Sequence, residues 1–145
     1  MTHETLKTFG YPQTLVHEYA HWCVLLRPAQ VTLGSLVLIC KEDVTQLADI
    51  SDAAFGEMKQ VVSDIETGLK GFRAWQKINY LALMMVDPHV HFHVIPRYDT
   101  DQAFSGTVFR DAGWPAVPQL AQALTPEPEV FGKLLLAIKA GWGHV

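Results

Sequence analysis

The chain has 145 residues, of which 11 are basic and 15 acidic, and 49% of its residues are hydrophobic. We expect a single domain over residues 1–145, with a core at about 9–115 and a Pro-rich segment and C-terminal helix at 116–145. The net charge of −4 without a basic run argues against nucleic acid as a partner, and the lack of a long apolar run or a signal-peptide pattern argues against a membrane and predicts a cytoplasmic protein.

The first half of the chain predicts three strands and a long helix. Residues 14–28 form two short strands around a polar kink, and residues 35–40 form a third, whose apolar residues on both faces predict a central place in the sheet. Ser51 and Asp52 are typical of a helix N-terminus. Apolar residues then recur at intervals of three and four, which predicts an amphipathic helix of about five turns: Phe55, Met58, Val62, Ile65 and Leu69.

The second half of the chain adds two strands and a closing helix. Residues 78–86 are nearly all apolar and predict a fourth strand, and the run DPHVHFHVIPRY at residues 87–98 predicts a fifth. Residues 99–128 contain several prolines and are expected to be irregular, whereas EVFGKLLLAIKAG predicts the last helix. Together these elements predict an α+β fold with an antiparallel sheet of about five strands, the long helix packed on it, and a C-terminal helix.

The fifth predicted strand carries three histidines at alternate positions, His89, His91 and His93. Successive side chains of a strand point to opposite faces, so the interleaved valine and phenylalanine residues are expected to pack under the long helix. The imidazoles then share the other face, with neighbours about 7 Å apart along the strand, and can flank one ligand. The other histidines, at positions 3, 17, 21 and 144, show no spacing that joins this run.

Three interpretations of the histidine run stay open at this point. The run can be a solvent-exposed strand face, which tolerates many polar residue types. It can hold a metal ion, although three histidines along one strand span about 13 Å, which is long for a single ion. It can also supply a nucleophile, because a neutral imidazole attacks phosphorus near pH 7 while its neighbours bind phosphate oxygens and transfer protons.

The segment HVHFHVIPR resembles the signature of the histidine triad (HIT) family, in which three histidines alternate with apolar residues. The following Pro-Arg is common in its fragile-histidine-triad and dinucleoside polyphosphate hydrolase branches. The upstream segment RPAQVTLGSLVLICKEDVTQLADIS is similar to the family's strand–turn–strand, so the likeness covers roughly residues 14–98. The resemblance implies a HIT-like fold, a nucleotide substrate and a homodimer.

The resemblance also implies a role for each histidine. His91 would be the nucleophile that attacks the α-phosphorus of a nucleoside phosphate derivative and forms a covalent nucleotidyl-histidine. His93 would contact the phosphate and help to protonate the leaving group, and His89 would orient the network. The hairpin of residues 14–40 and the start of the long helix would form the nucleobase pocket. No cofactor is required, although a divalent cation can accompany a polyphosphate substrate.

Three departures from the family pattern bear on substrate choice. Ser35 stands where many members have a fourth histidine, and Arg27 stands near the usual ribose-binding Asp or Asn. The Gly-rich loop before the triad is missing, because the predicted fourth and fifth strands leave only residues 86–88 between them. We expect Ser35, Arg27, Arg97 and Asn79 to bind the substrate, since they can offer hydrogen bonds or positive charge beside a phosphate.

Two other functions compete with a HIT-type hydrolase or nucleotidyl transferase. One is a catalytically weak nucleotide-binding regulatory module, which the departures at Ser35 and Arg27 favour. The other is a metal-dependent hydrolase in which His89, His91 and His93 are the ligands, although no residue is assigned to a metal in the favoured interpretation.

Overall fold

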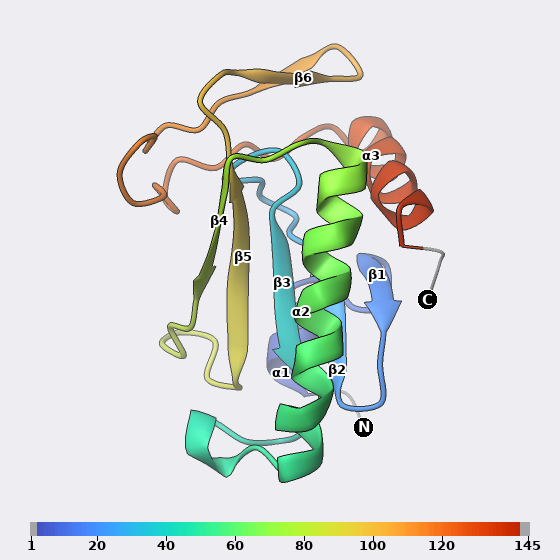
Figure 1. The fold of residues 1–145 in the computed structure, drawn as a ribbon, viewed down its shortest axis with the longest axis vertical. Helices are drawn as coiled ribbons and strands as arrows, with labels where there is room; N and C mark the ends of the chain where they lie inside the picture. Colours follow the sequence, from blue (N-terminus) through green and yellow to red (C-terminus); the bar gives the residue numbers. More distant parts are fainter. Residues whose placement is uncertain (1–2, 143–145) are drawn as a thin grey trace.

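The computed structural model describes residues 3–142, which are built around one antiparallel sheet (Figure 1). The strand order is β1-β2-β3-β5-β4, and β3 lies in the centre with all of its side chains buried, as predicted. The strands are β1 (Leu15–Glu18), β2 (Trp22–Leu26), β3 (Leu36–Cys40), β4 (Lys77–Leu81) and β5 (His91–Arg97). The predicted α+β fold is therefore confirmed.

The long helix α2 (Asp52–Phe72) covers one face of the sheet, which we call the helix face (Figure 1). It begins where predicted, because the Ser51 hydroxyl accepts a hydrogen bond from the Ala54 N–H at 3.1 Å. The C-terminal helix α3 (Pro128–Ala140) packs beside α2. Gly68 of α2 allows this close approach, since a Cβ atom there would lie 2.5 Å from the Trp142 ring.

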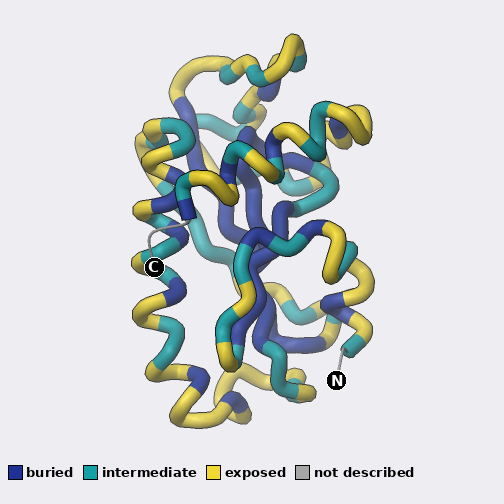
Figure 2. Tube along the Cα trace, turned by 90° about the vertical axis from the view of Figure 1, so that its right-hand side faces the viewer, coloured by how far each residue is buried: buried dark blue, intermediate teal, exposed yellow. Residues whose placement is uncertain are grey.

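The other face of the sheet carries the short helix α1 (Glu4–Thr8), which lies behind the strands in Figure 1. We call this the histidine face. Its apolar side chains form a separate cluster: Leu6, Phe9, Cys23, Leu25, Val37 and Ile39. The burial colouring of Figure 2 shows a buried interior, to which β2, β3 and β5 contribute, while the surrounding segments alternate between exposed and buried. No helix among residues 3–142 is long and apolar enough to cross a membrane.

A short N-terminal helix and a small hairpin were not predicted. Helix α1 is too short to show a periodic apolar pattern. The region 99–128, expected to be irregular, contains a hairpin of β6 (Gln102–Phe104) and β7 (Thr107–Phe109). Its turn residues Ser105 and Gly106 both have positive φ, at 50° and 80°, which suits a two-residue hairpin turn. A Ser-Gly pair often marks a turn, so this pair could have predicted the hairpin.

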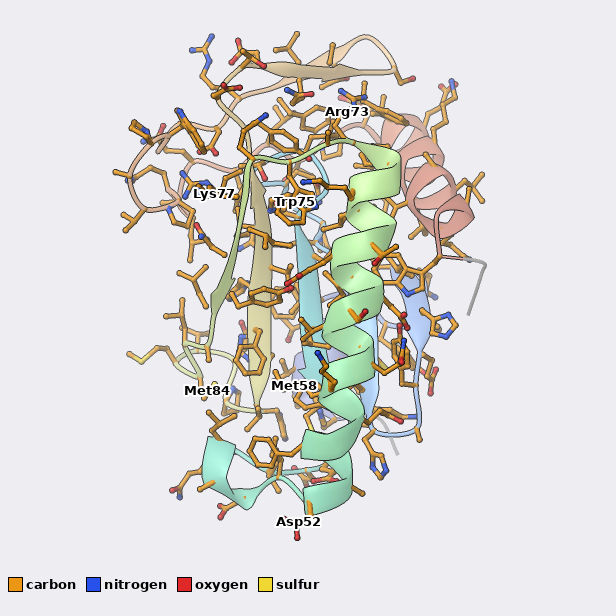
Figure 3. The ribbon with its side chains drawn as sticks, viewed as in Figure 1. Asp52, Met58, Arg73, Trp75, Lys77 and Met84 are labelled. Carbon is orange, nitrogen blue, oxygen red and sulfur yellow. The ribbon has the colours of Figure 1, made fainter. Side chains whose placement is uncertain are left out.

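The connection before the triad is longer than predicted. The fourth strand was expected to reach residue 86 but ends at Leu81, and the fifth begins at His91 rather than at His89. The last pair between the two strands joins Leu81 to His93, and the backbone of Val90 bonds on the other side, to Val44 and to Cys40 at the end of β3. Residues 82–90 form a loop, in which Met84, labelled in Figure 3, has a φ of 25°, so the expected connection through residues 86–88 alone is wrong.

Candidate active site

The alternation of β5 separates its side chains as predicted. Phe92 and Val94 join the apolar cluster beneath α2, together with Val90 just before the strand. His91 and His93 lie on the histidine face, where their ring centroids are 5.1 Å apart and their planes meet at 84°. The structure thus brings the imidazoles together instead of splaying them.

His91 is held in one orientation by a backbone carbonyl. Its Nδ1 atom lies 2.7 Å from the carbonyl oxygen of His89. A carbonyl oxygen only accepts hydrogen bonds, so Nδ1 must carry the proton, and in the neutral ring Nε2 then has the free lone pair. No described residue makes a hydrogen bond to that Nε2. This is the tautomer that a nucleophilic imidazole needs.

His89, just before β5, is fixed from two sides. Its Nε2 lies 2.8 Å from the Asp43 carboxylate, and its Nδ1 lies 3.0 Å from the Thr5 hydroxyl. The His89 backbone N–H also donates to the Thr5 hydroxyl oxygen at 3.3 Å. The ring of His3 stacks on His89 with centroids 3.9 Å apart and planes within 8°. His89 therefore links the N-terminal segment to the nucleophile candidate.

His93 occupies a different electrostatic environment. Its Nδ1 is buried and has no hydrogen-bond partner. Burial, the positive charge of Arg27 and the neighbouring His91 lower the pKa of His93 to about 4. The ring is therefore neutral at pH 7, and it can donate a hydrogen bond through one ring N–H without carrying a positive charge.

Arg27 is the predicted substrate-binding residue whose charge acts on the triad, because it lowers the pKa of His93. Its Nη1 donates to the Ala29 carbonyl, but its Nε is buried without a partner. Burial lowers the pKa of the guanidinium, and Asp87 opposes that shift. Asp87 is not close enough to form an ion pair with it.

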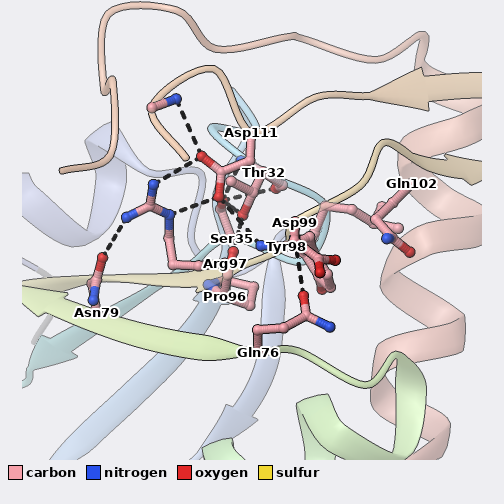
Figure 4. Close-up of polar contacts among 12 residues, drawn as sticks. Thr32, Ser35, Gln76, Asn79, Pro96, Arg97, Tyr98, Asp99, Gln102 and Asp111 are labelled. Carbon is pink, nitrogen blue, oxygen red and sulfur yellow. Dashed lines mark hydrogen bonds and ion pairs between the residues drawn. The ribbon is translucent and has the colours of Figure 1, made fainter. Parts of the chain in front are cut away.

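The other three predicted substrate-binding residues are bonded to protein groups away from the triad. Arg97, at the opposite end of β5, donates to both carboxylate oxygens of Asp111 at 2.7 and 2.9 Å and to the Asn79 side-chain oxygen at 2.8 Å (Figure 4). The Ser35 hydroxyl donates to the Thr32 carbonyl at 2.8 Å and accepts from its N–H at 3.0 Å. These contacts give all three residues a structural role within the protein.

The imidazoles are covered by the N-terminal segment. His89, His91 and His93 are 9%, 2% and 6% exposed. The Phe9 ring lies with its centroid 5.9 Å from those of both His91 and His93. The start of the long helix was expected to line the nucleobase pocket, but that expectation is wrong, because α2 packs on the opposite face of the sheet.

Sequence reasoning missed the residues that surround the triad. His3, Thr5, Phe9 and Asp43 come from segments far from β5 in the sequence, and only the folded chain brings them to it. His144 lies outside the described residues. Within residues 3–142, no group of three His, Cys, Asp or Glu side chains is arranged to hold a metal ion, so the metal-ligand interpretation of the triad gains no support.

Comparison with known proteins agrees with this geometry. The HIT domain family matches residues 11–100. Histidine triad proteins of Sinorhizobium meliloti and Bradyrhizobium japonicum superpose with TM-scores of 0.75 and 0.70, at 19% and 20% identity, and each comparison covers 97% of this chain and 96% of the other.

A third similar structure is a hypothetical histidine triad nucleotide-binding protein of Sulfolobus tokodaii, with a TM-score of 0.67 and 20% identity over 89% of this chain and 83% of that one. No curated protein matches the sequence. Because the family match spans more than half of the chain and includes the whole histidine run, this protein belongs to the HIT domain family.

Proposed function

We propose that this protein binds a nucleotide and acts as a phosphoric anhydride or phosphoramidate hydrolase, or as a nucleotidyl transferase, through a covalent intermediate on His91. The observation that carries the proposal is the hydrogen bond from His91 Nδ1 to the His89 carbonyl, which leaves Nε2 as the nucleophilic nitrogen. The similar protein of Sulfolobus tokodaii is described as nucleotide-binding, which supports the substrate class.

The proposed reaction has two steps. In the first, the Nε2 lone pair of His91 forms a bond to the α-phosphorus, and the bond from phosphorus to the leaving group breaks with its electron pair. A phosphate leaving group departs as an anion, to which an N–H of the neutral His93 ring can donate a hydrogen bond, and an amine leaving group takes its proton from solvent. Positive charge develops on the His91 ring, and the His89 carbonyl at 2.7 Å stabilises it. In the second step, water or an acceptor attacks the phosphorus and releases His91.

We assign phosphate binding to Arg27 and His93. Buried polar atoms are nearly always hydrogen-bonded, so the unpartnered Arg27 Nε and His93 Nδ1 favour a ligand as their missing partner. Leu25, which shares a face with Arg27, pairs with Val37, and Val37 pairs with His93. The two side chains thus emerge from one face of the sheet, two strand spacings apart across it and two residues apart along it, which is about 12 Å. This separation suits an extended phosphate chain, such as that of a dinucleoside polyphosphate.

Access to His91 requires movement of its cover. The ring is only 2% exposed, and Phe9 lies against it and His93. We expect a bound nucleotide to displace the Phe9 ring while the histidines, held by the sheet, keep their places.

We also propose that the protein is a homodimer that pairs through the edge strand β4. Among the described residues, β4 has a neighbour only on its β5 side. The loop that follows exposes Met85 and Val86, which are 80% and 93% exposed. An exposed strand edge beside an apolar loop is a template for pairing with a second chain. A monomeric mass in solution would contradict this assembly.

The function is tested with a hydrolysis panel of dinucleoside polyphosphates, nucleoside phosphoramidates and nucleotide sugars, each with wild type and His91→Ala. We expect wild type to release a nucleoside monophosphate from at least one substrate class and the variant to release none. Equal rates in the two proteins would show that His91 is not the nucleophile.

The alternative is a nucleotide-binding module without turnover, which is favoured by the engagement of Ser35 in its own turn. The same panel separates the two functions, because the module would bind nucleotides and release no product. Chelator treatment and metal analysis of the purified protein test the metal-dependent alternative.

A further inference from the structure

His89 makes hydrogen bonds through its side chain and its backbone to residues that have no proposed role in substrate binding. The ring contacts Asp43 at 2.8 Å and Thr5 at 3.0 Å, and the backbone N–H contacts Thr5 at 3.3 Å. The carbonyl of the same residue accepts the proton of His91 Nδ1. Every polar atom of His89 is therefore engaged, and three of its four contacts come from residues 5 and 43.

The proton assignments in this network are consistent with one another. A carboxylate only accepts, so His89 Nε2 carries a proton and donates it to Asp43. In the neutral ring Nδ1 then accepts from the Thr5 hydroxyl, whose oxygen in turn accepts the His89 N–H. Thr5 is 1% exposed, so the loss of its hydroxyl would leave buried polar atoms of His89 without a partner.

His3 places Thr5 in this network. Its Nδ1 accepts the Leu6 N–H and caps helix α1, while its Nε2 lies 2.7 Å from the Cys40 carbonyl. The ring also covers His89 by stacking. The N-terminal segment is thereby attached both to the sheet and to the residue that orients the nucleophile.

We propose that Thr5 and Asp43 are positioning residues for His91 that act through His89; this inference rests on the proposed nucleophilic role of His91. They fix the His89 backbone and ring, so that its carbonyl keeps the proton on His91 Nδ1 and leaves Nε2 free. When His89 is loosened, a neutral His91 can place its proton on Nε2 instead, and that tautomer cannot attack phosphorus. The titratable groups that face His89 are His3, Asp43 and His91.

The test compares Thr5→Val, which removes the hydroxyl at nearly constant shape, with Thr5→Ser, which keeps it. Thr8→Val, at an exposed position of the same helix, is the matched control. We expect Thr5→Val to lower kcat by roughly 10- to 100-fold with little change in KM, and Thr5→Ser and Thr8→Val to stay near wild type. The acid limb of the kcat–pH profile should also move in Thr5→Val only.

A second readout does not depend on activity. Nitrogen chemical shifts of the His91 ring should show the Nδ1–H tautomer in wild type and a mixture of tautomers in Thr5→Val. Asp43→Asn is the companion variant, because the Asp43 side chain is 87% exposed and its replacement does not threaten folding. We expect it to lower kcat by about two- to fivefold.

The outcomes separate this inference from the proposed function. The positioning role would be overturned if the His91 tautomer were unchanged in both Thr5→Val and Asp43→Asn and if either folded variant kept the wild-type kcat. A wild-type protein that turns over no nucleotide, yet shows the tautomer change in Thr5→Val, would refute the enzymatic function and leave the hydrogen-bond network established.

Discussion

The two ends of strand β5 carry buried polar side chains in opposite states. At the Arg97 end, the guanidinium is bonded to Asp111 and Asn79, and its donors are occupied by the protein. At the histidine end, His93 Nδ1 is buried without a partner, and so is the Nε of Arg27, whose charge lowers the pKa of His93. Buried polar atoms are usually paired, and among the described side chains the one further exception is Trp75 Nε1. The Arg97 end is thus satisfied within the protein, whereas the histidine end is where we propose that a ligand binds.

The largest expected effect is a loss of turnover without a large loss of stability, and it concerns His91 at the histidine end of β5. His91→Ala should reduce turnover by more than about 1,000-fold, because the covalent intermediate can no longer form. The same substitution should change the free energy of unfolding by less than about 2 kcal/mol, since His91 makes only one side-chain hydrogen bond. Product release in the hydrolysis panel and urea unfolding measure the two effects. Severe unfolding without a specific loss of turnover would contradict the assignment.

The Arg97 end should behave in the opposite way. Asp111→Asn leaves the buried Arg97 charge uncompensated, and we expect it to lower the free energy of unfolding by about 3–5 kcal/mol. The turnover of the molecules that stay folded should be unchanged.

The matched control for this substitution is Asp101→Asn, which breaks the exposed pair with Arg110 and should have an effect of less than about 1 kcal/mol. Equal destabilisation by Asp111→Asn and Asp101→Asn in chemical unfolding would remove the distinction between the two ends of β5.

Replacing Arg27, which we propose binds phosphate, should have a smaller effect, and the effect should be on substrate affinity. Arg27→Gln should raise KM for a dinucleoside polyphosphate by roughly 10-fold, because a neutral amide replaces the charge beside the phosphate, while thermal stability changes little. Arg27→Lys keeps the charge and should recover part of the affinity. Steady-state kinetics measure both variants. An unchanged KM in Arg27→Gln would place Arg27 outside the substrate site.

The smallest effect is a pH dependence of stability. The pKa of His93 in the folded protein, about 4, lies below that of an unfolded histidine, so the unfolded chain binds a proton first as pH falls. Stability present at pH 7 should therefore decrease as pH falls through 6.5 toward 4, by about 1–2 kcal/mol between pH 7 and 5.

Burial also lowers the pKa of His3, which adds to this pH dependence in the same direction. Comparing wild type with His93→Gln isolates the His93 contribution, because only the His93 part should disappear from the pH curve of the variant. A pH dependence identical in both proteins would argue against the buried, neutral His93.

The parts of the fold that follow local patterns could be predicted from the sequence. The alternation around His91 and the spacing of apolar residues in α2 placed the imidazoles and the long helix on opposite faces, because period-2 and period-3.6 patterns determine which side chains are buried. The end of β4 could not be predicted in this way. It depends on which residues pair with β5, where the last pair joins Leu81 to His93, and such pairing between distant segments is a tertiary contact.

The same division applies to the site. The triad histidines form a sequence motif, but the groups that hold and cover them, Thr5, Phe9 and Asp43, reach them only through the folded chain. Arg97 was expected to bind substrate because positive charge beside a phosphate is favourable. Its carboxylate partner, Asp111, lies 14 residues away, and no sequence pattern indicates that the two are paired and buried.

The central claim is that His91 is the nucleophile, and trapping the intermediate tests it most directly. The protein should be mixed with the substrate that the panel selects, quenched rapidly and digested, and the peptides that contain residues 89–97 should be analysed by mass spectrometry. We predict a mass increase of one nucleotidyl group on His91, absent in His91→Ala. Turnover with the nucleotidyl group on another residue, or turnover in His91→Ala, would contradict the claim.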